Sequence, residues 1–99
     1  MKDRTHEEAT AELFKEDPAY AIELLNNILE AGEQGELLIA LRQMTKAFGG
    51  VPAIAEKAQL NATQLYRTLS EQGNPELRSL SAILKAMGLR LAVKRNRAA

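Results

Sequence analysis

The stretch GGVPAIAEKAQLNATQLYRTLSEQGNP, residues 49–75, decides the fold. It opens with the pair Gly49-Gly50, which stops a preceding helix because glycine adopts the left-handed C-cap conformation without steric cost. Two short helices are predicted behind this pair, over about 52–58 and 62–71, with a turn at 59–61. Two short helices joined by about three residues have the geometry of a helix-turn-helix.

The interior of this unit is predicted from its small and apolar positions. Ala55 is small enough to lie where the first helix crosses the second. Asn61 is a suitable N-cap for the second helix, and Gln64 completes a pair that resembles a capping box. Gln59 departs from the usual pattern, because such a turn typically has glycine there and a left-handed non-glycine residue costs about 1 kcal/mol. The apolar positions that pack inside the unit are Ile54, Ala58, Leu60, Leu65 and Leu69.

The outer face of the second helix is polar, and its side chains suit the edges of DNA bases. Glutamine pairs bidentately with adenine, arginine with guanine, and threonine bonds either base or contacts a thymine methyl group. A generic helical bundle shows the same spacing, and Tyr66 stacks either on DNA or on the core. The base-reading candidates are Asn61, Thr63, Gln64, Tyr66 and Arg67. The phosphate-binding candidates are Lys57, Asn74 and Arg78, together with a helix N-terminus.

Helix signals also dominate outside this stretch. Further helices are predicted over residues 5–16, from Asp17-Pro18 to Ala31-Gly32, and over about 36–48 and 77–87. Residues 89–94 then alternate apolar and polar side chains, which is typical of a short strand. Because a lone strand cannot satisfy its backbone groups, we expect it to pair, with its own copy across a two-fold axis as the candidate.

Charge divides the chain into two parts, although the net charge is zero. Residues 1–36 contain ten acidic and three basic residues, a sum of −7. Residues 37–99 contain ten basic and three acidic residues, a sum of +7. We therefore predict an acidic partner-binding extension at 1–36, a helix-turn-helix domain with its strand at 37–94, and a basic tail at 95–99. Solvated helix faces with chance clustering are the alternative.

The residue inventory is poor for an enzyme. The chain has no cysteine, and its single histidine, His6, has no further metal ligands at suitable spacing. The acids follow amphipathic helices as expected for solvent-facing positions. We expect no catalytic residues, no metal and no cofactor. No apolar run approaches a membrane span, and MKDRTHEEAT lacks the apolar core of a signal peptide, so a cytoplasmic protein is expected.

Residues 14–94 resemble a known family. The segments DPAYAIELLNNILEAG and ELLIALRQMTKAFGG, and above all LYRTLSEQGNP followed by a helix and GLRL, are similar to putative addiction-module antidote proteins, small antitoxins related to the HigA type. The resemblance implies an all-α, lambda-repressor-like helix-turn-helix bundle of five to six helices, here with a short C-terminal β-strand. It assigns DNA reading to the five candidates on the second helix and a structural role to Ala55, Leu60 and Leu65.

The resemblance also implies a function with two partners. Such antidotes bind and block a small basic RelE/HigB-like toxin, and they bind double-stranded operator DNA as homodimers to repress their own operon. The alternative is a stand-alone phage-type transcriptional regulator with no toxin partner. The acidic first third is the expected toxin surface, and residues 89–93 are the candidate dimer contact. Lys94, Arg95 and Arg97 either attract phosphates or simply form a soluble terminus.

Overall fold

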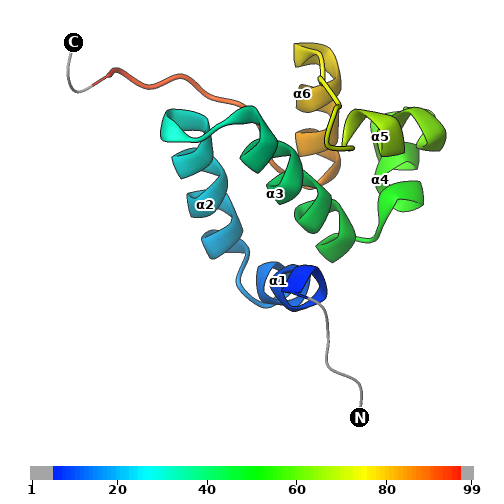
Figure 1. Cartoon of the computed structure of the whole chain (residues 1–99), viewed down its shortest axis with the longest axis horizontal. Coiled ribbons are helices and arrows are strands. Elements are labelled where there is room, and N and C mark those ends of the chain that lie inside the picture. Colours follow the sequence, from blue (N-terminus) through cyan, green and yellow to red (C-terminus); the bar gives the residue numbers. More distant parts are fainter. Residues whose placement is uncertain (1–5, 97–99) are drawn as a thin grey trace.

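The computed structural model describes the backbone of residues 6–96 and the side chains of residues 9–96. Within that range the chain forms six helices (Figure 1). They are α1 (His6–Glu16), α2 (Pro18–Ala31), α3 (Gln34–Ala47), α4 (Val51–Ala58), α5 (Ala62–Thr68) and α6 (Leu77–Ala86). The predicted helical architecture is confirmed, and it is compatible with a helix-turn-helix bundle.

The predicted C-terminal strand is wrong for the described chain. Residues 89–96, which we call the arm, follow α6 without regular secondary structure. Leu89 and Leu91 pack against the core, whereas Arg90 and Ala92 are exposed. Over residues 89–92 the alternation therefore comes from an arm that lies on the core with one side, whereas Val93 is exposed. A strand also needs a neighbour for its backbone groups, and residues 6–96 contain no second strand that would pair with it.

The main helix boundaries follow from local chemistry, as predicted. Asp17 caps α2 by accepting a hydrogen bond from the N–H of Tyr20 at 3.2 Å, with Pro18 at the first helical position. Gly49 and Gly50 have φ values of +123° and +91° behind α3, so both need the conformational freedom of glycine. These caps fix where α2 begins and α3 ends.

Two boundaries differ from the prediction by more than one residue. α3 begins two residues early, at Gln34, because the Glu36 side chain accepts a hydrogen bond from the N–H of Glu33 at 3.1 Å. α5 ends early, at Thr68. The Ser70 hydroxyl donates to the Arg67 carbonyl at 2.7 Å, which uses an acceptor of the last turn.

One hydrophobic core joins the helices. α3 contacts α1, α2 and α4, and α4 in turn contacts α5 and α6. The core contains residues from both sides of position 36, so the two segments share one core. Partner binding by residues 1–36 and DNA binding by residues 37–94 stay predictions. Its buried members are Phe14, Ala21, Leu25, Leu41, Met44, Ile54, Ala55, Leu65, Leu69, Ile83, Leu84 and Met87.

Candidate nucleic-acid interface

The turn between α4 and α5 sets the position of α5. Gln59 adopts the left-handed conformation, with φ 59° and ψ 41°, as predicted for this departure from glycine. Asn61 then accepts a hydrogen bond from the backbone N–H of Gln64 at 3.1 Å. Only this half of the predicted capping box forms among the described residues, because the Gln64 side chain lines a cleft instead. Ala55 is buried at the crossing, 2% exposed, as the prediction requires.

Burial divides α5 into two faces. Leu65 on α5 and its C-cap Leu69 are each 1% exposed and belong to the core. The predicted polar positions Thr63, Gln64 and Arg67 are all exposed. Positions 63, 64, 66 and 67 lie within one broad arc of the helix, opposite Leu65. α5 thus presents a continuous polar face to solvent.

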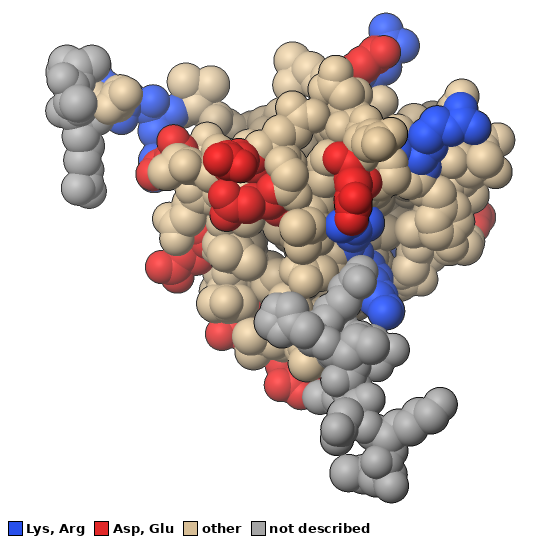
Figure 2. Space-filling model, viewed as in Figure 1, with Lys and Arg blue, Asp and Glu red and all other residues tan. Residues whose placement is uncertain are grey.

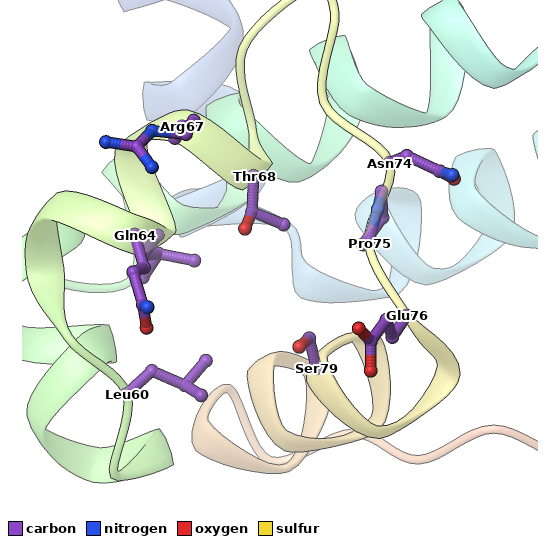
Figure 3. A pocket seen from close by; sticks show the side chains of 9 residues that line it. Leu60, Gln64, Arg67, Thr68, Asn74, Pro75, Glu76 and Ser79 are labelled. Atoms are coloured by element: carbon purple, nitrogen blue, oxygen red, sulfur yellow. The ribbon is translucent and has the colours of Figure 1, made fainter.

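A cleft of about 250 Å³ lies beside this face, between α5 and the start of α6 (Figure 3). Gln64 and Arg67 line it from α5. Glu76 and Ser79 line it from the other side. The cleft therefore combines a cation and an amide on one wall with a carboxylate and a hydroxyl on the other. Such a set donates and accepts hydrogen bonds in the way that base edges require.

The loop after α5 builds the second wall by a close backbone approach. A Cβ atom added to Gly73 would lie 1.9 Å from the carbonyl oxygen of Thr68. No side chain fits there, so residue 73 has to be glycine for the loop to turn back this tightly. Gln34 at the start of α3 donates from Nε2 to the Gly73 carbonyl at 3.1 Å and to Asn74 Oδ1 at 3.4 Å. These contacts fix the loop relative to α3.

The structure brings together only three of the eight predicted site residues. Gln64, Arg67 and Asn74 line the cleft, although the Asn74 side chain points away from the other two (Figure 3). The other five do not line it, and their roles stay predictions: Lys57, Asn61, Thr63, Tyr66 and Arg78.

Tyr66 lies at a second hollow of about 350 Å³. Its side chain is 60% exposed, so it is not part of the core. Arg42 and Lys46 of α3 line the same hollow. Arg42 donates from Nη1 to the carbonyl of Leu69, the C-cap of α5, where a cation is favourable. Arg42 thus fixes the end of α5 and places positive charge beside Tyr66.

The sequence did not identify Glu76, Ser79 or Arg42 as site residues. Glu76 is the N-cap of α6 but makes no side-chain capping bond, so it leaves no cap signature in the sequence. Its one signal is that it directly follows Asn74-Pro75, where a loop was predicted. Arg42 is one of several polar residues on α3, and only its contact with Leu69 gives it a role.

Charge is unevenly spread over the described surface. Figure 2 shows most acidic side chains over α2 and the lower edge of the molecule, whereas basic ones lie on the arm, over α5, at the top and in the centre of this face, the last two next to further acidic side chains. Glu76 is an exception, since it places a negative charge at the cleft. The outer part of the predicted basic tail, residues 97–99, and the His6 side chain lie outside the described residues.

The described residues contain no cluster of three His, Asp or Glu residues that would hold a metal ion. No helix within the described range has the length and apolar character needed to cross a membrane.

Comparison with known proteins places the chain in a family. No curated protein and no solved structure matches it. A family model described as "Probable addiction module antidote protein" matches residues 6–95, which is nearly the whole chain and includes both walls of the cleft. The chain belongs to this family of addiction module antidote proteins.

Proposed function

We propose that the chain is the antitoxin of a toxin–antitoxin module, which neutralises a small basic RelE/HigB-like toxin and represses its own operon by binding operator DNA. It acts as a binding protein and not as an enzyme. The proposal of DNA binding rests on one observation, the exposed polar face of α5. A tight turn positions this face, and the chain belongs to the antidote family.

The chemistry of this face supports insertion into the major groove. α5 has seven residues, and its polar positions lie opposite the buried Leu65. Arg67 offers a planar fork of donors that fits the O6 and N7 atoms of guanine, and Gln64 fits adenine. As a homodimer the protein would present two such helices to the two halves of a palindromic operator.

Arg67→Ala tests this half. In a gel-shift titration on the chain's own upstream DNA, with random DNA as competitor, we expect specific binding to weaken by about 1–3 kcal/mol. Lys85→Ala is the matched control, because Lys85 is an exposed cation on α6 that does not line the cleft. Equal operator affinity for Arg67→Ala and the parent would contradict the assignment of Arg67 to base reading.

The toxin-neutralising half is supported by family membership and by the acidic first third of the chain. Residues 1–36 sum to −7, which complements a basic RNA-cutting partner. The test is co-purification with the protein encoded by the adjacent reading frame, at two salt concentrations. A stable, salt-sensitive complex supports the antitoxin. Specific operator binding with no toxin partner would favour the stand-alone regulator, which would use the same α5 face.

A further inference from the structure

A third hollow is a groove between α2 and the arm, and no residue of α5 lines it. Its volume is about 400 Å³. Ile22, Leu25 and Leu29 line it from α2, and Leu89 and Leu91 line it from the arm. The arm leaves the end of α6 and runs past α2 (Figure 1). We call this groove and its two rims the α2–arm surface.

The α2–arm surface exposes large apolar side chains. Ile22 is 41% exposed and Leu29 is 46% exposed, and they lie on one face of α2 because they are two helical turns apart. Val93 on the arm is 99% exposed. Ile22 and Leu29 line the groove, and Val93 lies between Ala92 and Lys94, which also line it. Several exposed apolar side chains at one groove mark a protein–protein contact, whereas a single exposed residue would not.

The two rims of the groove carry opposite charges. Glu30 lines the groove from α2, and Glu23 is exposed on the same helix. Arg90 and Lys94 line it from the arm. A two-fold contact uses the same patch on both copies, so the patch has to be complementary to itself. A surface with an acidic rim, an apolar floor and a basic rim meets that condition, because the arm of each copy can face the α2 helix of the other.

The backbone of the arm adds unused hydrogen-bonding groups. Leu89 donates its N–H to the Leu84 carbonyl at 2.8 Å, but residues 90–95 form no hydrogen bond in the described chain. These N–H and C=O groups lie beside the apolar groove and are available to a partner.

We infer that the α2–arm surface docks the same surface of a second copy of this chain, with the basic arm of each copy over the acidic face of the other copy's α2. This inference names the dimer contact of the proposed repressor. Its test measures self-association without DNA or toxin, so it fails or succeeds separately from operator binding.

The first test is Val93→Asp, followed by sedimentation equilibrium of the full chain over a concentration series. Val93 is almost fully exposed, so the variant is expected to keep the parent's melting temperature. The dissociation constant of the dimer is expected to rise at least about tenfold, because two new charges would face the contact. An unchanged dissociation constant, or a parent that stays monomeric at every concentration, would overturn the inference.

A charge swap separates contact from folding. Arg90→Glu with Lys94→Glu makes both rims acidic, and Glu23→Lys with Glu30→Lys makes both basic, so each variant alone is expected to stay monomeric. Mixed in equal amounts, the two are expected to form a heterodimer, since each arm then meets an oppositely charged helix. The controls are Lys46→Glu with Lys57→Glu and Glu56→Lys with Glu71→Lys, which reverse exposed charges elsewhere. No heterodimer, or loss of toxin binding with unchanged self-association, would assign the surface to another partner.

Discussion

The two walls of the cleft beside α5 are held in different ways. The first wall is α5 itself, which a three-residue turn and the buried side chain of Leu65 fix to the core. The second wall is the loop that leads into α6, which is held by a backbone approach at Gly73 and by hydrogen bonds from Gln34. The first wall is held by the burial of apolar side chains. The second wall can form only because residue 73 has no side chain. The second wall is therefore the more fragile of the two.

Gly73→Ala is expected to have the largest effect. Its Cβ would lie 1.9 Å from the Thr68 carbonyl oxygen and 2.6 Å from the carbonyl carbon, and backbone cannot swing aside as a side chain does. We expect the free energy of unfolding to fall by about 3 kcal/mol, as measured by urea denaturation. Gly35→Ala is the control, because its Cβ would meet nothing within 4 Å. If both variants unfolded at the same urea concentration, the second wall would not depend on this contact.

Gln59→Gly sharpens the comparison at the first wall. Gln59 is the one non-glycine residue with positive φ in the described chain, at 59°. Glycine removes that strain, so the free energy of unfolding is expected to rise by about 1 kcal/mol, which is several degrees in melting temperature. Gln72→Gly, at an exposed position without positive φ, is expected to lower stability instead. A loss of stability in Gln59→Gly would show that the Gln59 side chain makes a contact that outweighs the strain.

The two walls also differ in how far the sequence predicts them. The first wall was predicted in detail, because helix periodicity, the Asn61 cap and the left-handed turn are local features that a sequence pattern encodes. The second wall was mostly missed. Its position depends on the approach of Gly73 to Thr68 and on a bond from Gln34, which lies 39 residues away from Gly73. Such contacts leave no period and no motif.

The predicted strand failed for a related reason. Alternating apolar and polar side chains at residues 89–94 indicate that one side of the segment is buried. They do not show whether that side packs on a neighbouring strand or on a helix. In the structure it packs on the helical core, which contacts Leu89 and Leu91. Periodicity therefore agrees with the packing of Leu89 and Leu91 on the core, but it predicted neither the exposure of Val93 nor the hydrogen bonding of the arm.

Gln34→Ala tests the remaining support of the second wall, with a smaller effect. The variant removes the hydrogen bonds to the Gly73 carbonyl and Asn74 Oδ1. Both are exposed, so we expect a loss of about 0.5 kcal/mol in urea denaturation, together with faster amide exchange in residues 70–76. Gln72→Ala, an exposed glutamine on the loop itself, is the control. Unchanged exchange in the loop would mean that Gly73 alone holds the wall.

Glu76→Gln tests how the second wall affects DNA binding, and its effect is expected to be the smallest. The Glu76 carboxylate lines the cleft opposite Arg67 and repels phosphates that approach it. Because Glu76 makes no side-chain capping bond, glutamine is expected to leave α6 intact. Binding to random DNA is then expected to tighten about twofold at low salt, and the gain should vanish as salt screens the charge. Glu71→Gln, an exposed acid that does not line the cleft, should change less. If Glu76→Gln instead weakened operator binding and left random DNA unaffected, the carboxylate would be accepting a hydrogen bond from a base, and both walls of the cleft would read sequence.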